Sequence, residues 1–313
     1  MGFIGGAVVG LLFPGQGSQY VGMGQDLFDA HPAARETFEE ADAVLGFALS
    51  RLCFEGPASD LVLTHNAQPA ILTHSVAVHR CLAGTFGPVA MAAGHSLGEF
   101  SAYVAAGSMS LADGLRTVRR RGELMLACGE SRRGTMAAII GLSEEATEAV
   151  CDGVSTHDSV CVAANYNAPG QTVISGDVAA VNRAMEAARA AGAKRAIALD
   201  VSGAFHSPLM ELAEPGLADQ LASVEFRAPV FPVVSNVTAS PVTAVTQALD
   251  LLRRQLTSPV RWADCMRRMR EHGVVSFLEL GPGNVLTGLL RRIDREAECR
   301  AIGSAADIGG VTA

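Results

Sequence analysis

The chain has 313 residues, of which 49% are hydrophobic and 18% are charged. It is therefore long enough for two domains or one large α/β domain, and too apolar to be disordered. Lysine and arginine number 24 against 32 aspartate and glutamate residues, a formal net charge of −8, so we expect neither nucleic acid nor a membrane among the partners.

Cysteine and histidine usage indicates a reducing compartment and no metal site. The seven cysteines are scattered and contain no Cys-x-x-Cys pair, which is typical of free thiols. The histidines form no His-Glu-x-x-His pattern. The apolar opening at 3–13 lacks a basic region and is shorter than the roughly 20 residues of a bilayer span, so it predicts a buried first strand. We expect a cytoplasmic protein and a monomer.

Short apolar runs alternate along the chain with stretches of helical periodicity, which is typical of a parallel sheet covered by helices on both faces. The candidate strands are 8–13, 89–93, 232–235, 274–280 and 299–302. The candidate helices between them include 24–44, 69–82 and 97–105. These elements predict an α/β fold with a doubly wound sheet.

A further helix is predicted to begin after Ser110, which together with Asp113 forms a start similar to a capping box. At 100° per residue, Arg121 lies about 60° from Val118 on the apolar face of this helix, whereas Arg120 points to the opposite side. Of three consecutive arginines, Arg121 is therefore the one that we expect to turn towards the core.

From Thr135 the elements become shorter. The sequence predicts a strand at 136–140, a helix after Ser143, strands at 160–165 and 172–175, a helix that begins after Asp177, and a strand at 195–201. This order, βαββαβ, is the ferredoxin-like arrangement. We therefore predict a large α/β domain made of 1–133 and 202–313, and a small ferredoxin-like domain at 134–201 inserted into it.

A G-x-S-x-G motif at 94–98 lies between a predicted strand and a predicted helix. In that context the motif is typical of a nucleophile elbow, in which two glycines permit a tight turn that presents the serine hydroxyl. The alternative is a glycine-rich turn without chemistry, but the strand and helix on either side favour Ser96 as a catalytic nucleophile.

A serine hydroxyl is a weak nucleophile until a nearby base takes its proton, and histidine is the usual base near neutral pH. His95 is adjacent to Ser96 in sequence, but in an elbow its side chain should point away. His206, in the loop after the last strand of the small domain, is the better candidate. From spacing alone, a purely structural role for this loop histidine is about as probable.

A glycine-broken loop, FPGQGSQ at 13–19, follows the first predicted strand. Because ligands gather at the carboxyl ends of parallel strands, this loop and the Ser96 turn should face one crevice. The backbone around Gln16 could then approach a substrate oxygen. A phosphate-binding turn is the alternative, although the loop lacks the Walker lysine and the G-x-G-x-x-G spacing.

Together these stretches resemble the acyltransferase family that moves malonyl groups from coenzyme A to acyl carrier protein, which includes the transacylases of bacterial fatty-acid synthesis and the acyltransferases of polyketide synthesis. The resemblance covers almost the whole chain. Its motifs are at 13–19, 68–70, 94–99, 121–122, 136–142, 165–176, 205–207 and 281–283. It implies an α/β-hydrolase-like parallel-sheet subdomain with an inserted ferredoxin-like (βαββαβ) subdomain, in agreement with the pattern of elements.

Carried over by position, the resemblance implies that Ser96 is the nucleophile and that His206 is the general base, oriented by the main-chain carbonyl of Gln255. The main-chain N–H groups of Gln16 and Leu97 would form the oxyanion hole. The substrate-binding residues that the resemblance implies are Arg121, Phe205, Gln68, Asn165 and Gln255.

The reaction implied is ping-pong transfer, in which malonyl-CoA acylates Ser96 and the phosphopantetheine thiol of acyl carrier protein then takes the malonyl group. No metal or redox cofactor is implied. Arg121 would bind the free carboxylate and so favour malonyl over acetyl groups. Phe205 and Leu97 resemble the malonyl-selective members, whereas Gly203 departs from the histidine that many malonyl-selective polyketide members have there.

Two other functions remain open from the sequence. An esterase or thioesterase could use the same serine and histidine with water as the acceptor, and a docking module without activity would need neither. Arg121 and the loop around Gln16 favour the transferase. The sequence does not distinguish fatty-acid synthesis from polyketide synthesis, because both use this chemistry.

Overall fold

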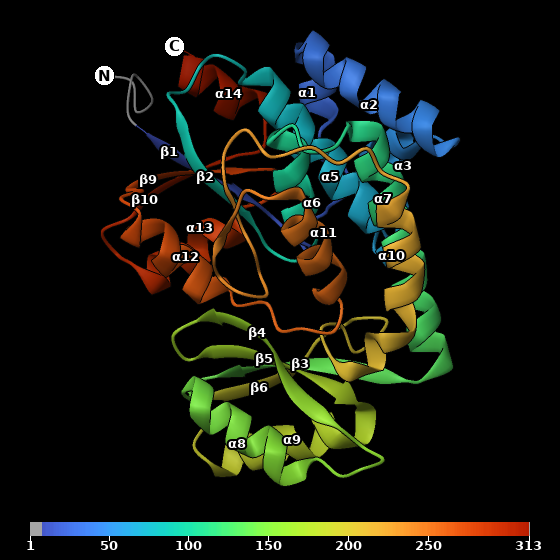
Figure 1. The fold of residues 1–313 in the computed structure, drawn as a ribbon, viewed down its shortest axis with the longest axis vertical. Helices are drawn as coiled ribbons and strands as arrows, with labels where there is room; N and C mark the ends of the chain where they lie inside the picture. Colours follow the sequence, from blue (N-terminus) through green and yellow to red (C-terminus); the bar gives the residue numbers. More distant parts are fainter. Residues whose placement is uncertain (1–7, 313) are drawn as a thin grey trace.

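The computed structural model describes residues 8–312 and contains two separate sheets (Figure 1). The part of the predicted first strand at 3–7 lies outside the described residues. Within 8–312, no helix combines the length and the apolar character that crossing a membrane requires.

The larger sheet has six strands in the order β10-β9-β1-β2-β7-β8. Its strands are β1 (Val9–Phe13), β2 (Val89–Gly94), β7 (Val233–Val234), β8 (Pro241–Val242), β9 (Ser276–Leu280) and β10 (Glu298–Ile302). The pairs from β10 to β7 are parallel, and β8 is antiparallel to β7. All five predicted strands are present, and their carboxyl ends lie at one edge of the sheet.

Helices cover both faces of this sheet, as predicted. They are α1 (Gln25–Ala30), α2 (Pro32–Leu45), α3 (Leu49–Glu55), α4 (Ala58–Leu61), α5 (Thr64–Cys81), α6 (Leu97–Ala105), α7 (Leu111–Ser131), the 3₁₀ helix η1 (Pro208–Ala213), α10 (Glu214–Ala222), α11 (Val245–Arg254), α12 (Trp262–Glu271), α13 (Val285–Ile293) and α14 (Ala305–Thr312). Side chains alternate along β1: Leu11 and Phe13 join the core with α5, α6 and α7, whereas Leu12 joins the core with α12 and α13.

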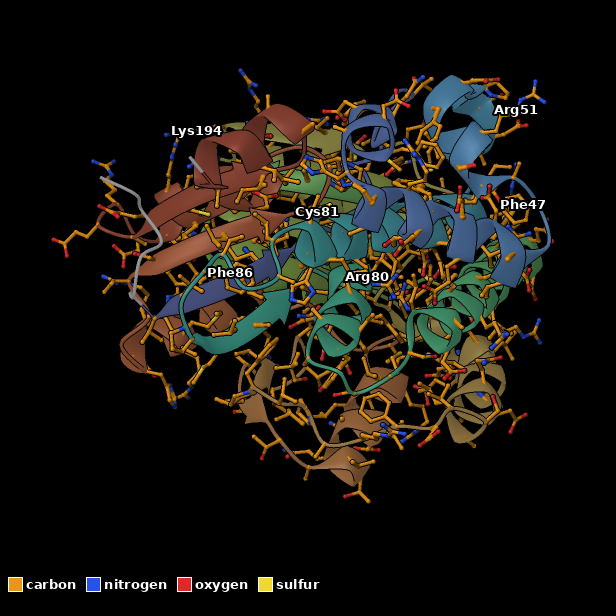
Figure 2. All side chains as sticks on the ribbon, turned by 90° about the horizontal axis from the view of Figure 1, so that it is seen from above. Phe47, Arg51, Arg80, Cys81, Phe86 and Lys194 are labelled. Atoms are coloured by element: carbon orange, nitrogen blue, oxygen red, sulfur yellow. The ribbon has the colours of Figure 1, made fainter. Side chains whose placement is uncertain are left out.

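The single helix predicted at 24–44 is wrong, because the chain forms two helices there. His31 adopts an extended conformation between α1 and α2. Its successor, Pro32, disfavours the helical conformation in the residue before it, which ends α1 and starts α2. Arg80, labelled in Figure 2, lies near the end of α5. It donates hydrogen bonds to Thr37 and Glu40 of α2, at 3.1 and 2.8 Å, and so connects α5 to α2.

The predicted start of α5 at Pro69 is also wrong, since the helix begins at Thr64 and contains the proline. A proline in a helix leaves the carbonyl four residues earlier without its N–H partner. Here that carbonyl belongs to His65, and Arg119 of α7 donates a hydrogen bond to it at 3.0 Å. A partner more than 50 residues away therefore lets the helix continue through Pro69.

The smaller sheet has four antiparallel strands in the order β4-β5-β3-β6. Its elements are β3 (Gly134–Ile140), α8 (Glu144–Val154), β4 (Cys161–Ala168), β5 (Gln171–Asp177), α9 (Val178–Ala190) and β6 (Arg195–Ala198). Helices α8 and α9 cover the face turned away from the larger sheet (Figure 1). The predicted βαββαβ order and the overall fold class are confirmed. The domain boundaries, 1–133 with 202–313 and 134–201, stay a prediction.

Candidate active site

Ser96 lies in the sharp turn between β2 and α6, at the carboxyl edge of the larger sheet. Its φ of 50° and ψ of −105° are unfavourable for a residue with a side chain, and such strain is concentrated at functional sites. A Cβ on Gly94 would lie 1.8 Å from the Gly98 carbonyl carbon, and a Cβ on Gly98 would lie 2.0 Å from the Phe13 carbonyl oxygen. The turn can therefore close only with glycine at both positions.

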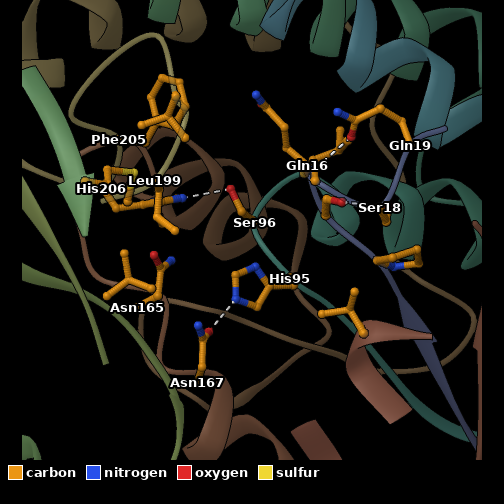
Figure 3. Close-up of a pocket in the computed structure, with 18 of the residues that line it drawn as sticks. Gln16, Ser18, Gln19, His95, Ser96, Asn165, Asn167, Leu199, Phe205 and His206 are labelled. Atoms are coloured by element: carbon orange, nitrogen blue, oxygen red, sulfur yellow. Dashed lines mark hydrogen bonds between the residues drawn. The ribbon is translucent and has the colours of Figure 1, made fainter. Parts of the chain in front are cut away.

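His206 and Ser96 form a hydrogen-bonded pair. Ser96 Oγ lies 2.8 Å from His206 Nε2, and His206 Nδ1 lies 2.8 Å from the main-chain oxygen of Gln255. Because a carbonyl oxygen only accepts, Nδ1 carries the proton and Nε2 is left to accept one from Ser96. The other candidate, His95, points away from Ser96 and contacts Asn167 Oδ1 at 2.8 Å through its Nε2 (Figure 3).

The environment of His206 keeps its imidazole neutral. Burial, followed by the positive charge of Arg121, lowers the pKa of His206 from 6.5 to about 3. At neutral pH the ring therefore has a free lone pair on Nε2. A neutral imidazole in contact with a serine hydroxyl is the protonation state that a general base requires.

Arg121 of α7 is turned inwards as predicted, with only 1% of its surface exposed. Its Nη1 donates to Gln68 Oε1 at 2.9 Å, and its Nη2 donates to Gln255 Oε1 at 3.0 Å and to Ser96 Oγ at 3.1 Å. Its Nε is buried without a hydrogen-bond partner among the described residues. Burial lowers the pKa of Arg121 to about 10, which still leaves the guanidinium charged at neutral pH.

A cavity of about 380 Å³ opens beside Ser96, between the two sheets. The predicted site residues that line it are Gln16, Ser96, Leu97, Arg121, Asn165, Phe205 and His206. Gln68 and Gln255, which the resemblance places in the substrate pocket, are fully buried and do not line it. Their side-chain oxygens instead accept hydrogen bonds from Arg121, so both residues support the guanidinium from behind.

Two main-chain N–H groups next to Ser96 are available for an oxyanion. The N–H groups of Gln16 and Leu97 donate no hydrogen bond within residues 8–312. Leu97 is the first residue of α6, where the N–H is free and the helix dipole favours negative charge. The Gln16 side chain donates to Thr64 Oγ1 at 3.1 Å, which anchors the loop after β1.

Sequence reasoning missed Asn236. Its Oδ1 accepts a hydrogen bond from the main-chain N of Ser96 at 2.7 Å, and its Nδ2 donates to the carbonyl of Gly94 at 2.8 Å. Asn236 therefore holds both sides of the nucleophile turn. A signal was present, because Asn236 follows the predicted strand at 232–235, and residues at the carboxyl ends of parallel strands surround the ligand.

The site also contains a buried carboxylate to which sequence reasoning assigned no role. Glu99 belongs to the motif at 94–99, and its Oε2 accepts hydrogen bonds from Gln255 Nε2 at 2.6 Å and from the main-chain N of Asn236 at 3.2 Å. Burial raises the pKa of Glu99 to about 7, although these hydrogen bonds and Arg121 oppose the shift.

Comparisons with known proteins identify the family of the chain. Residues 11–308 match the acyl transferase domain family. The chain is 45% identical over 294 residues to the malonyl CoA-acyl carrier protein transacylase of Bacillus subtilis (strain 168), covering 94% of this chain and 93% of the relative. It is 46% identical over 283 residues to the protein of the same name from Escherichia coli (strain K12), covering 90% of this chain and 91% of that relative.

Solved structures share both the fold and the sequence pattern. The acyl-carrier-protein-S-malonyltransferase of Bartonella henselae is similar with a TM-score of 0.93 and 42% identity, over 97% of this chain and 98% of that one. A second similar chain comes from the structure of a type II PKS acyl-carrier protein in complex with its malonyl-transacylase. Its TM-score is 0.94 and its identity 41%, over 98% of this chain and 99% of that one. The chain therefore belongs to the malonyl CoA-acyl carrier protein transacylase family of acyl transferases.

Proposed function

We propose that this chain transfers a malonyl group from malonyl-CoA to the phosphopantetheine thiol of an acyl carrier protein through a malonyl ester on Ser96. The observation that carries the proposal is the buried Arg121 guanidinium, which lies 3.1 Å from the Ser96 hydroxyl. A fixed positive charge beside a nucleophile selects acyl groups that have a second, negatively charged end. The names of the relatives support the same substrate pair.

In the first half of the reaction, Ser96 Oγ attacks the thioester carbonyl of malonyl-CoA and its proton passes to His206 Nε2. The N–H groups of Gln16 and Leu97 stabilise the tetrahedral oxyanion. When that intermediate collapses, the carbon–sulfur bond breaks and the coenzyme A thiolate takes the proton from His206. The products are a malonyl ester on Ser96 and free coenzyme A.

The second half runs in the opposite direction with a different thiol. His206 Nε2 takes the proton of the phosphopantetheine thiol, and the sulfur attacks the ester carbonyl of the malonyl-serine. The same two N–H groups stabilise the second oxyanion. Collapse releases Ser96 Oγ, which recovers its proton from His206, and the malonyl group leaves on the carrier protein.

The free donor of Arg121 supports a carboxylate as the distant group of the substrate. Nε and Nη2 lie on one edge of a guanidinium, the arrangement that pairs bidentately with a carboxylate. Nε has no partner among the described residues, and Nη2 already points at Ser96 Oγ. A malonyl ester on Ser96 would place its carboxylate beside this edge, whereas an acetyl ester would leave Nε unpaired.

We propose further that the enzyme works in the cytoplasm as a monomer and needs neither a metal nor a redox cofactor. All seven cysteines are free thiols, which suits a reducing compartment. The nucleophile, the base and the oxyanion donors all come from one chain. Carrier proteins of fatty-acid and of polyketide synthesis both supply the required thiol, and a panel of purified carriers of each kind distinguishes the two roles.

Intact-protein mass spectrometry after brief exposure to malonyl-CoA tests the proposal. The wild type should gain one malonyl group, Ser96→Ala should gain none, and addition of a phosphopantetheinylated carrier protein should move the group to the carrier. A malonyl group that persists in Ser96→Ala would contradict the assigned nucleophile. Release of free malonate in place of malonyl-carrier protein would make the enzyme a hydrolase.

A further inference from the structure

Glu99 lies directly beneath the active site and takes no part in the chemical steps above. The side chain is fully buried on α6, and its Oε1 has no hydrogen-bond partner among the described residues. Its other oxygen accepts from Gln255 and from Asn236. Burying a carboxylate is unfavourable unless its contacts compensate for the lost hydration.

Gln255 connects three parts of the site. Its main-chain oxygen accepts from His206 Nδ1, its Oε1 accepts from Arg121 Nη2, and its Nε2 donates to Glu99 Oε2 and to the main-chain oxygen of Ser96 at 3.1 Å. Through this residue, the carboxylate of Glu99 is linked to the guanidinium of Arg121.

Glu99, together with the main-chain oxygen of Ser96, fixes the direction of the Gln255 amide. Glu99 Oε2 can accept from Gln255 Nε2 as a carboxylate oxygen or as the carbonyl oxygen of a neutral acid, so it holds the NH₂ end of the amide and leaves the oxygen end for Arg121. If the amide turned over, its NH₂ group would face a guanidinium that also only donates, and Arg121 would lose an acceptor. When Glu99 is ionised, its negative charge also supports the charged state of Arg121.

The contact with Asn236 has a different consequence. The main-chain N of Asn236 donates to Glu99, and the Asn236 side chain holds the main-chain N of Ser96. A change at Glu99 that acts through Asn236 would displace Ser96 itself. Such a change would therefore slow the transfer of every acyl group. A change at Glu99 that acts through Gln255 would slow only the transfer of acyl groups whose carboxylate binds Arg121.

We propose that Glu99 is a positioning residue that, by fixing the Gln255 amide, holds Arg121 in place for the free carboxylate of the acyl group and so sets the preference for malonyl over acetyl. This inference rests on the proposed function. Glu99 touches no substrate in this scheme, and the ratio of the two activities separates its action on Arg121 from its action on the nucleophile turn.

The test compares kcat/KM for malonyl-CoA and acetyl-CoA in the wild type and in Glu99→Met, which conserves approximate volume but removes the acceptor. The ratio of malonyl to acetyl activity should fall roughly 10-fold or more, the loss expected for a hydrogen bond to a charged group. Ser101→Ala is the matched control, because Ser101 is buried on the same helix and has no partner among the described residues; its ratio should not change. An equal fall of both activities in Glu99→Met would overturn the proposal.

Further variants follow the route from Glu99 to Arg121. Glu99→Gln keeps the size and one acceptor oxygen, so it should recover most of the ratio. Gln255→Met removes the acceptor for Arg121 but keeps the main-chain carbonyl for His206, so its ratio should fall as in Glu99→Met. The double variant should fall no further than either single variant, because both act on one link; effects that multiply would contradict the route.

Two safeguards keep the outcome decisive. Circular dichroism checks that each variant folds, and if Glu99→Met does not, Glu99→Asp carries the same test, because the shorter side chain withdraws from Gln255 and the ratio should still fall. Acylation of wild-type Ser96 by malonyl-CoA is measured in parallel. Absence of that acylation would reject the proposed function, whereas acylation with an unchanged ratio in the variants would reject only the role of Glu99.

Discussion

At the scale of single residues, burial changes how strongly the ionisable groups of the site bind protons. His206 is neutral because it is buried beside a positive charge, and Arg121 stays charged although it is almost completely buried. Main-chain and amide oxygens of Gln255 contact both side chains. Gln255 therefore orients both the proposed base and the guanidinium that we propose binds a carboxylate.

The protonation state of His206 leads to a prediction about pH. Because its pKa is lowered to about 3, the base should remain in its active form well below neutral pH. The rate of inactivation by phenylmethylsulfonyl fluoride, an uncharged reagent for activated serines, should stay constant from about pH 7 down to about pH 5. A fall in this rate centred near pH 6.5 would show instead that His206 titrates like an ordinary histidine.

Arg121→Ala should remove the preference for malonyl groups. Loss of the charged donor should lower malonyl transfer by roughly 10-fold to 100-fold, while acetyl transfer should fall much less. Steady-state rates with malonyl-CoA and acetyl-CoA provide the comparison. Arg120→Ala is the control, because Arg120 is exposed on the same helix and its substitution should leave both rates unchanged. Equal losses with both substrates would mean that Arg121 only stabilises the fold.

The residues that sequence alone identifies are those whose local pattern already specifies their geometry. Ser96 follows from its glycines, and Arg121 follows from its angle on a helix. The roles of Glu99 and Asn236 do not follow in this way. Glu99 forms hydrogen bonds with Asn236 and with Gln255, which both lie more than 130 residues later in the chain, and Asn236 also contacts Gln255. These contacts depend on which strands and loops meet in space.

At the scale of elements, strands were easier to predict than the ends of helices. A buried parallel strand is a short apolar run with turns on both sides, and five such runs correspond to strands of the larger sheet. The start of α5 was missed because the carbonyl that Pro69 leaves unpaired is satisfied by a side chain of another helix, Arg119. Local sequence contains no information about such a partner.

Arg119→Ala should therefore destabilise the protein. The substitution removes hydrogen bonds to the His65 carbonyl and to Asn66 Oδ1, and we expect a loss of about 1 to 3 kcal/mol in the free energy of unfolding. Urea unfolding followed by circular dichroism measures this change. Arg116→Ala, at an exposed position of the same helix, is the control and should change stability by much less. Equal stability of the two variants would remove Arg119 as the support of α5.

At the scale of the whole molecule, buried titratable groups couple stability to pH. His74 is fully buried on α5, and burial lowers its pKa from 6.5 to about 4. Between these pH values the unfolded chain binds a proton that the folded chain does not, so stability is lost as pH falls through this window. Glu99 acts in the opposite direction, because its pKa is raised from 4.5 to about 7 and its burial becomes less favourable as pH rises.

Replacing His74 should make stability less sensitive to acid. In His74→Met, the free energy of unfolding should fall less steeply between about pH 6 and about pH 5, by on the order of 1 kcal/mol per pH unit. Urea unfolding at several pH values measures the slope. His157→Met, at a fully exposed position, should keep the slope of the wild type. An unchanged slope in His74→Met would mean that His74 does not titrate differently on folding.

Main-chain hydrogen bonds join the smaller sheet to the segment between α11 and α12. Tyr166 N of β4 donates to the Val260 carbonyl at 2.9 Å, and Val260 N donates to the Ala164 carbonyl at 2.8 Å. Val260 lies five residues after Gln255, so the segment that orients the His206 imidazole is also hydrogen-bonded to the inserted sheet. Moving the smaller sheet away from the larger one would therefore displace the proposed base, so we expect acyl groups to enter and leave the cavity without a change in the relative position of the two sheets.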